Sequence, residues 1–426
     1  LIPHSGLFFT EFDVSADSPR PINHESLAAP FITIEMTPRS TADDWSAGLA
    51  SPEMSVFSTY SASEERLRIV VTRRGEELVL AEIFCPSSAS TGTAVSITEN
   101  LVTVWAFQLP GWHAILSHRI QLESGIDLRQ KAQLAGAHLF YSGIFDKIRA
   151  GYFGYTGLRD PQLVRLANGE PLVLANRSYF TATCAGPGFF QTAHWAVFST
   201  SFDDPEDIRL ESHLFFHRDG LLLGDHAGFL MMDKLGHFLL GVSSWGDFDN
   251  NVHIRSSMSE EELLKGVHTL SSMRWPVPTD SACWDPSIFW HAGRWWLSFV
   301  ECLNYEPRFV FRPVLAKSRF GAVWNSIFDR VGADVVHLQT EGTLLTPLNG
   351  ELYVLASDGD ARDYPIYDLQ MNRIATLNAP YGSNIPHPMI IERDDGNLIM
   401  TFDGTGHDED LLGYGTHGDI LLYKEG

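Results

Sequence analysis

Residues 283–302 read CWDPSIFWHAGRWWLSFVEC, and this stretch decides how the chain folds. Asp285 and Pro286 open an apolar run that turns at residues 291–293 (HAG) and continues as a second apolar run. Proline suits only the first residues of a strand, because it cannot donate to a strand ladder. The pattern therefore predicts a β-hairpin that begins with a carboxylate. A buried carboxylate is costly unless it is paired or in use, so Asp285 is a candidate functional residue.

The same pattern recurs in residues 160–180, 225–245, 341–358 and 387–404. Each copy has a polar anchor, an apolar strand, a glycine-containing turn and a second apolar strand. The anchors are spaced by 65, 60, 56 and 46 residues, and they are Asp160, Asp225, Asp285, Glu341 and His387. The turn glycines follow 8 to 11 residues later, at Gly169, Gly236, Gly293, Gly350 and Gly396. Units of about 50 residues with room for four strands are typical of propeller blades, so the sequence predicts a five-bladed β-propeller.

The anchors are predicted to converge although they are far apart in the sequence, because the innermost strand of every blade begins near the central axis. Four of the five anchors are carboxylates, and we take these as candidate catalytic residues: Asp160, Asp225, Asp285 and Glu341. The alternative is that the acidic anchors only cap the strand starts.

Residues 1–130 contain strand patterns without acidic anchors. Hairpins are expected at residues 65–84 and 94–109, and single strands at residues 31–36 and 112–120. This predicts an all-β chain in which a β-sandwich of jelly-roll or concanavalin type precedes the propeller. We expect residues 1–130 to be supporting or carbohydrate-binding and residues 131–426 to be the catalytic propeller.

Composition excludes several classes of partner. The formal net charge of −23 argues against nucleic acid and against an anionic membrane surface. The sequence contains no run of about 18 apolar residues, so it predicts no transmembrane helix. The sequence has no HExxH motif, P-loop or GxSxG elbow. It begins at Leu1 without a Met, so its start does not distinguish a cytoplasmic from a secreted protein, and nothing in it indicates the oligomeric state.

Two of the four cysteines lie on the hairpin quoted above. If the hairpin turns about residues 292–293, Cys283 and Cys302 fall opposite each other. They can then form a disulfide or remain two buried free thiols, and of these we favour the free thiols.

The anchor pattern resembles the five-bladed propeller glycosidases of glycoside hydrolase family 43 and its relatives, which are mostly furanosidases. The residues that carry the resemblance are Asp160-Pro161, the later Asp anchors, Glu341-Gly342 and His387, within about residues 155–424. Residues 1–130 resemble laminin-G or concanavalin-like modules. The resemblance implies an inverting hydrolase, a furanosidase or related exo-glycosidase, that acts on carbohydrate.

The resemblance also implies roles for the anchors. Asp160 corresponds to the general base, Asp225 to the acid that tunes pKa, and Glu341 to the general acid. This chain departs from the pattern because Asp285 opens the third unit and Glu341 the fourth. Either Asp285 is the general acid, or it shares the tuning role with Asp225. The family further implies a calcium ion in the channel, with His387 as its candidate ligand.

Five residues are candidates for substrate binding: Arg159, His226, Trp245, Trp284 and His387. Arg159 precedes Asp160 and can keep that carboxylate ionised, or it can be a surface cation. Tryptophan rings stack on sugar faces, but they are also ordinary packing residues in blades. His226 can contact substrate or bond to a neighbouring loop.

Two other functions remain open. A polysaccharide lyase acting on uronates would use His226 or Tyr155 as its base and Arg159 to neutralise the substrate carboxylate. The predicted acidic pocket disfavours it, because a lyase needs basic groups there. The other alternative is a propeller that binds glycans without catalysis, which would leave four carboxylates without a use.

Overall fold

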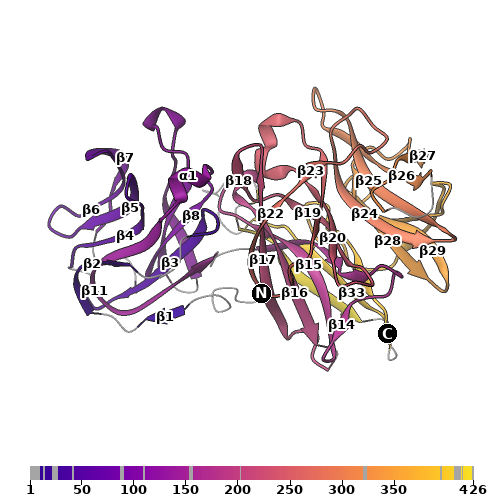
Figure 1. Cartoon of the computed structure of the whole chain (residues 1–426). Helices are drawn as coiled ribbons and strands as arrows, with labels where there is room; N and C mark the ends of the chain where they lie inside the picture. The colour runs from indigo at the N-terminus through magenta and orange to yellow at the C-terminus, as the bar shows by residue number, and fades with distance from the viewer. Residues whose placement is uncertain are drawn as a thin grey trace.

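The computed structural model describes residues 10–12, 15–21, 27–40, 43–86, 91–108, 111–152, 157–201, 203–319, 324–393, 396–406, 414 and 416–424. These residues are almost entirely β-structure, in two halves that lie side by side in Figure 1. None of the described helices is long and apolar enough to cross a membrane.

The N-terminal half is one extended antiparallel sheet with the strand order β10-β9-β8-β3-β11-β4-β5-β6-β7, and β1 and β2 pair with β11. Its strands are β1 (Thr10–Phe12), β2 (Ser15–Pro21), β3 (Phe31–Pro38), β4 (Trp45–Ala50), β5 (Met54–Ser61), β6 (Arg66–Arg73), β7 (Glu76–Phe84), β8 (Thr93–Thr98), β9 (Leu101–Gln108), β10 (Gly111–Arg119) and β11 (His138–Tyr152). Both predicted hairpins are present, as β6–β7 and β8–β9.

The long strand β11 joins the two layers of this sheet. Its first part pairs with β4, with Leu139 opposite Leu49, and its second part pairs with β3, with Ile148 opposite Met36. The outermost strands β7 and β10 lie near each other, so the sheet is nearly closed and sandwich-like. Because β11 runs to Tyr152, the sheet extends beyond residue 130, where the sequence placed the domain boundary.

Two short helical segments, η2 (Leu122–Ser124) and α1 (Lys131–Leu134), precede β11. The C-terminal half then forms five further sheets in a propeller-like arrangement. The first contains β12 (Gly157–Leu163), β14 (Val173–Leu174), β15 (Arg177–Ala185), β16 (His194–Ser201), β17 (Ile208–Arg218), β18 (Leu221–Leu223) and β22 (Gly266–Ser271), with η3 (Phe190–Thr192) between β15 and β16. The second contains β13 (Arg165–Leu166), β19 (His226–Met232), β20 (Phe238–Ser243), β21 (Ile254–Ser259) and β23 (Met273–Arg274), with η4 (Trp245–Asn250) between β20 and β21.

The last three sheets are simpler. They are formed by β24 (Cys283–His291), β25 (Arg294–Asn304), β26 (Val310–Ser318) and β27 (Phe328–Ala333); by β28 (Thr340–Leu348), β29 (Glu351–Asp358), β30 (Tyr364–Tyr367) and β31 (Arg373–Leu377); and by β32 (Met389–Ile391), β33 (Leu398–Asp403) and β34 (Asp419–Lys424). The five predicted anchors therefore lead into five different sheets.

The predicted turn glycines all have positive φ, between 77° and 110°. In the last four units the two predicted strands pair as a hairpin. The first unit differs, because β12 pairs with β15 only after an excursion through residues 164–176. In that excursion β13 pairs with β19 of the second sheet, which ties the two sheets together.

The inner strands of the first four sheets share an irregularity that the sequence pattern does not show. The register of each shifts at a bulge near its start, and the bulge contains one residue with φ between 51° and 68°. These residues are Asp160, Ala227, Asp285 and Gly342. A bulge bends a strand and changes where its side chains point.

The bulge at Asp285 also decides the state of the two hairpin cysteines. Between the turn and Ser287 the two strands keep the expected register, with Trp290 opposite Trp295. On the other side of the bulge, at Trp284 and Cys283, the register is displaced by one residue. Cys283 therefore lies opposite Glu301 instead of Cys302. Both thiols are free and buried, as favoured above, and burial raises the pKa of Cys283 to about 12.

The two halves share core packing at Phe31 of β3. This fully buried ring stacks on Phe215 of β17, with 5.2 Å between centroids, and lies 5.6 Å from the ring of His194. Phe31 belongs to the same buried cluster as residues of the first and last propeller sheets. The N-terminal half therefore packs directly against the propeller.

Candidate active site

A cavity of about 320 Å³ lies where the inner strands begin. It is lined by residues from all five propeller sheets and the loops between their strands: Arg159, Asp160, Phe189, Phe190, Ala227, Trp245, Trp284, Asp285, Phe309, Phe311, Gln339, Glu341, Asn384, Ile385, His387, Tyr414 and His417. Three predicted carboxylates and the predicted histidine thus meet at one cavity although their positions span more than 200 residues. The convergence argued from the repeat holds for these four anchors.

The bulges place two of the carboxylates. Asp160 and Asp285 are both the residue with positive φ in their strands, and such a conformation is uncommon for a residue other than glycine. Strained backbone of this kind persists only where the surroundings hold it, and it is concentrated at functional sites. Asp285 is held by its own neighbours, because its N–H donates to Ser243 Oγ over 2.9 Å and its carbonyl accepts from Thr343 Oγ1 over 2.9 Å.

One imidazole connects the carboxylates. His387 Nδ1 lies 3.4 Å from Asp160 Oδ1, and its Nε2 lies 3.7 Å from Asp285 Oδ2. The Gly342 N–H donates to Asp285 Oδ2 over 3.0 Å, and the Trp284 indole N–H donates to Glu341 Oε2 over 3.2 Å. Asp160, Asp285 and His387 are each 6–7% exposed.

Burial and mutual repulsion determine the protonation of the acidic groups. Desolvation, reinforced by the charges of Glu341 and Asp160, raises the pKa of Asp285 well above its usual value. Desolvation and the charge of Asp160 raise the pKa of Glu341 to about 7, although the bond from Trp284 and the charge of Arg159 oppose the shift. Burial lowers the pKa of His387, against the attraction of Asp160. The cavity therefore holds carboxyl groups that keep their protons near neutral pH.

Asp225, predicted to join these carboxylates, does not line the cavity. It is fully buried and accepts two hydrogen bonds from Arg218, Nε to Oδ2 over 2.6 Å and Nη2 to Oδ1 over 2.7 Å. Its Oδ1 also accepts from the Gly246 N–H over 3.1 Å. The bulge residue of this strand is Ala227, so Asp225 lies two residues before the position that faces the axis. Its role is to tie the strand to the segment that carries Trp245.

Register also explains the position of Glu341. The bulge residue of its strand is Gly342, so Glu341 corresponds in register to Trp284 of the neighbouring sheet and to Arg159 of the first. It reaches the cavity from the position just before the bulge. Asp285 and Glu341 are therefore not equivalent residues of the repeat, which gives them different surroundings and different partners.

Arg159 lines the cavity and is buried, so it is not the surface cation that the sequence left open; its effect on Asp160 stays a prediction. Its guanidinium carbon lies 4.7 Å from the centroid of the Phe402 ring and 4.5 Å from that of Tyr414. Within the described part of the chain, no ion pair joins it to Asp160. Its Nη2 donates to the Asn384 carbonyl over 3.4 Å. Arg159 is thus a buried cation held between two aromatic rings.

The two predicted tryptophans line the cavity, and His226 stands behind them. The rings of Trp245 and Trp284 are 5.3 Å apart. His226 is fully buried, stacks on Trp245 at 6.4 Å, and has its Nδ1 2.8 Å from the Gly224 carbonyl oxygen. It is not among the described residues that line the cavity. Tyr155, the other base considered for a lyase, lies outside the described residues.

Sequence reasoning missed much of the cavity wall, because these residues lie outside the repeated inner strands, and all but Phe311 of β26 lie in connections between strands. They are Phe189, Phe190, Phe309, Phe311, Gln339, Asn384, Ile385, Tyr414 and His417. A signal was available for Asn384 and Ile385, which stand just before Pro386 and the His387 anchor. Both have positive φ, 57° and 51°, at the entrance to the last sheet.

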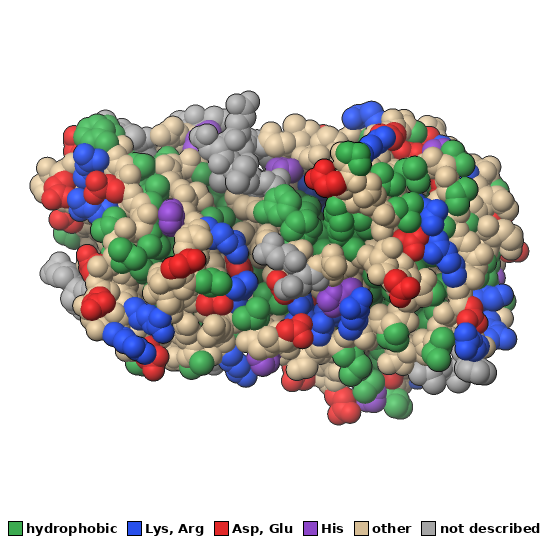
Figure 2. Space-filling model, turned by 90° about the horizontal axis from the view of Figure 1, so that it is seen from above, with side chains coloured by type: hydrophobic (Ala, Val, Ile, Leu, Met, Phe, Trp, Pro, Cys, Tyr) green, Lys and Arg blue, Asp and Glu red, His purple; other side chains and the backbone are tan. Residues whose placement is uncertain are grey.

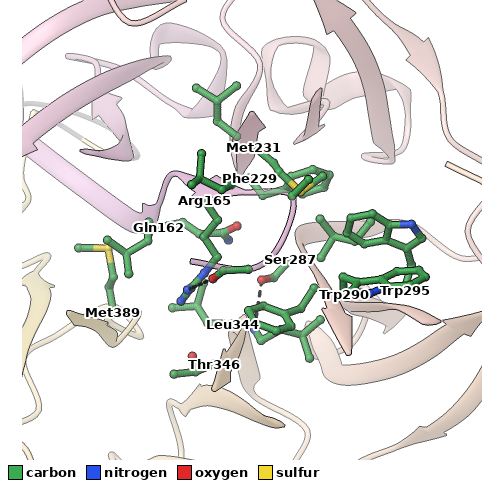
Figure 3. Close-up of a pocket in the computed structure, with 18 of the residues that line it drawn as sticks. Gln162, Arg165, Phe229, Met231, Ser287, Trp290, Trp295, Leu344, Thr346 and Met389 are labelled. Carbon is green, nitrogen blue, oxygen red and sulfur yellow. Dashed lines mark hydrogen bonds between the residues drawn. The ribbon is translucent and has the colours of Figure 1, made fainter. Parts of the chain in front are cut away.

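Below the carboxylates the channel is filled by side chains. Figure 3 shows Phe229 and Met231 of β19, Leu344 of β28 and Met389 of β32 among the residues there, and the space left between the lining residues is about 20 Å³. That volume holds about one water molecule. Arg165 also lies in this plug and donates to the Gly169 carbonyl over 2.8 Å. These side chains leave no room for a sugar among them.

The calcium predicted near His387 has a weak ligand set in this structure. Both ring nitrogens of His387 face carboxylates, Asp160 and Asp285. The described residues contain no group of three or more His, Cys, Asp or Glu side chains arranged to hold a metal ion. Calcium takes six to eight oxygen ligands, which this arrangement does not supply from side chains. Calcium binding stays a prediction.

No family model matches this sequence, and no curated protein matches it. Three solved structures illustrate the folds it is similar to. A family 43 β-xylosidase/α-arabinofuranosidase from a compost microbial metagenome is 13% identical, over 63% of this chain and 91% of that one, with a TM-score of 0.44. The GH43_1 enzyme from Xanthomonas citri, in complex with xylotriose, is 12% identical over 63% and 88%, with a TM-score of 0.45. A family 32 β-fructofuranosidase from Bombyx mori is 17% identical over 63% and 60%, with a TM-score of 0.42. These identities are too low to assign an activity to this chain.

Proposed function

We propose that this protein is a glycoside hydrolase that uses Asp160, Asp285 and Glu341. The observation that carries the proposal is the meeting of three carboxyl groups and one imidazole at a single buried cavity, where two of the carboxyls have raised pKa values. Glycoside hydrolysis needs one protonated carboxyl to donate to the leaving oxygen and one carboxylate on the other face of the sugar. Carboxyls that repel each other in a buried site supply both forms.

The surroundings of each carboxyl support a division of roles. Glu341 is the proposed general acid, because a pKa of about 7 leaves about half of it protonated at pH 7 and most of it protonated below that pH. Asp160, which faces His387, is the proposed base that activates water for an inverting displacement. Asp285, whose pKa is raised well above its usual value, is the proposed tuning residue. The sequence left open that Asp285 shares this tuning role with Asp225. We now assign the role to Asp285 alone, because the Asp225 carboxylate pairs with Arg218.

The shape of the cavity supports action on a terminal sugar. The channel below the carboxylates is plugged, so the sugar at the reaction centre has no exit on that side. We therefore propose an exo-glycosidase, of the furanosidase type that the anchor pattern implies. The N-terminal half is proposed to be a supporting module, since Phe31 packs into the propeller core.

The acidic cavity argues against the lyase alternative. Arg159 is the sole Lys or Arg among the described lining residues, and its guanidinium lies between Phe402 and Tyr414. A lyase must hold the substrate carboxylate with cations, whereas three carboxyls of the chain surround this site.

The test compares Asp160→Ala and Glu341→Ala with the unchanged protein on arabinan, xylan and 4-nitrophenyl glycosides. Each loss is expected to reduce the rate by about 10²–10⁴-fold. Glu341→Ala should spare the 4-nitrophenyl glycosides, because 4-nitrophenolate is a good leaving group that needs little protonation, whereas Asp160→Ala should slow both classes and be rescued by azide. Asp360→Ala is the control, since that carboxylate is 60% exposed in a surface ion pair. An unsaturated, ultraviolet-absorbing product would identify a lyase, and binding without turnover a glycan-binding protein.

A further inference from the structure

Six aromatic rings form a continuous wall beside the cavity; five of them line it, and the sixth, Tyr305, stacks on the lining residue Phe309. Neighbouring ring centroids along this wall are 4.2 to 5.6 Å apart, in the order Phe189, Phe190, Trp245, Trp284, Phe309 and Tyr305. The rings belong to the first three propeller sheets. Phe189 and Phe190 lie at the start of η3 and Trp245 lies in η4, whereas Trp284 lies in β24, and Tyr305 and Phe309 lie in the connection between β25 and β26. The repeat does not account for a wall of this kind, because most of these residues lie outside the inner strands.

The wall runs from the floor of the cavity to the surface. Trp284 and Trp245 are 1% and 6% exposed, whereas Phe189 and Tyr305, at the two ends, are 42% and 40% exposed. Hydrophobic side chains gather near the middle of the face shown in Figure 2. Exposed aromatic surface that continues into a cavity is a mark of a binding site.

The buried part of the wall meets the proposed acid. The Trp284 indole N–H donates to Glu341 Oε2 over 3.2 Å. A general acid must lie against the oxygen of the leaving group, so the group attached to that oxygen has to pass close to Trp284. The polar lining residues Gln339, Asn384, His387 and His417 belong to other segments of the chain and can serve the hydroxyl-rich sugar.

We propose that the aromatic wall is a leaving-group subsite that accepts an aromatic aglycone, such as the phenolic part of a plant or microbial glycoside. This inference rests on the proposed function and deepens it. Offset and edge-to-face contacts between rings add attraction beyond the burial of area, and a wall of rings offers several such contacts to one aryl group. A second sugar offers only its C–H face to the same surface.

The reaction with such a substrate balances without any further reagent. Water adds its oxygen to the anomeric carbon while the bond from that carbon to the phenolic oxygen breaks. Asp160 takes a proton from the water, and Glu341 gives its proton to the departing oxygen. The products are the free sugar and the phenol, which leaves along the wall toward Phe189 and Tyr305.

The direct test measures binding, so it does not depend on turnover. Phenyl and methyl 1-thio-α-L-arabinofuranosides and 1-thio-β-D-xylopyranosides, which resist hydrolysis, are titrated calorimetrically into the full chain. The free phenol 4-nitrophenol is titrated as a probe that needs no sugar site. We expect the phenyl compounds to bind at least about tenfold more tightly than their methyl partners, and 4-nitrophenol to bind measurably.

Variants then locate the binding. Phe189→Ala and Tyr305→Ala should each reduce the phenyl-to-methyl ratio and weaken 4-nitrophenol binding severalfold, and leave the methyl compounds unchanged. Phe84→Ala, a 59% exposed ring of the N-terminal half, is the matched control. The inference is overturned if the ratio stays near one, or if aryl binding persists unchanged in both wall variants. If either result is found while glycosides are still cleaved, the proposed hydrolase function stands and only the aromatic subsite is refuted. If no glycoside is cleaved but 4-nitrophenol still binds at the wall, the hydrolase function is refuted and the aromatic binding site stands.

Discussion

The hydrogen bond from Trp284 to Glu341 offers a sensitive test of the proposed acid. An N–H donor stabilises the ionised carboxylate, so this bond holds the pKa of Glu341 down to about 7 against desolvation and the charge of Asp160. Trp284→Phe removes the donor and keeps an aromatic ring. The pKa of Glu341 should therefore rise. Because Glu341 acts in its protonated form, the fall in activity on the alkaline side should move to higher pH.

The size of the shift follows from the geometry. Hydrogen bonds to charged groups contribute about 1.5–3 kcal/mol, and a separation of 3.2 Å lies at the long end of the normal range, so the lower figure applies. One pKa unit corresponds to about 1.4 kcal/mol, and we expect a shift of about one pH unit.

The assay is kcat/KM against pH with a substrate whose leaving group needs protonation. Trp245→Phe is the control, because that ring lines the same cavity and no hydrogen bond joins it to Glu341. An unchanged alkaline limb in Trp284→Phe, or one displaced to lower pH, would refute the assignment of Glu341 as the acid. Thermal unfolding of both variants checks that the cavity is intact.

Three further outcomes follow from the structure. Asp225→Asn should lower stability by about 3–5 kcal/mol, because it leaves the buried Arg218 guanidinium with only the exposed Asp219 as a charged partner. The folded fraction should keep its pH profile, and a changed profile at unchanged stability would restore Asp225 to the chemistry. Phe31→Ala should cost about 3–5 kcal/mol and lower the unfolding temperature of the propeller, whereas Phe84→Ala should not; an unaffected propeller transition would show that the halves are independent. The buried thiols of Cys184, Cys283 and Cys302 should react with a thiol reagent only after denaturation. Fewer than four reactive thiols in denaturant would reveal a disulfide, which the register shift at Asp285 argues against.

The repeat could be found in the sequence because its physical causes are local. Each unit needs an apolar strand, a turn residue that tolerates positive φ, and a second apolar strand, and these requirements recur at a steady spacing. The five turn glycines all have the expected conformation. The same reasoning located the hairpins of the N-terminal half, where alternation and turn residues coincide.

The anchors show where local reasoning ended. Four of the five anchors line one cavity: Asp160, Asp285, Glu341 and His387. Asp225 stands in the same sequence pattern, but its carboxylate pairs with Arg218 instead. The difference is a bulge placed two residues later, at Ala227. Since side chains alternate between faces along a strand, a small change of register decides which residue faces the axis. A bulge depends on pairing with the next strand, which the pattern within one strand does not record.

The sequence by itself determined the all-β character, the repeated hairpins and the identity of most groups that could do chemistry, because these follow from residue type and spacing along the chain. The tertiary structure alone decided which carboxyls meet, which of them keep a proton, and that a wall of rings from Phe189 to Tyr305 stands beside them. The physical reason is that pKa values and cavities arise from burial and from neighbours more than a hundred residues away, such as Asp160 acting on Glu341. Those neighbours are assembled only when the sheets close around their common axis.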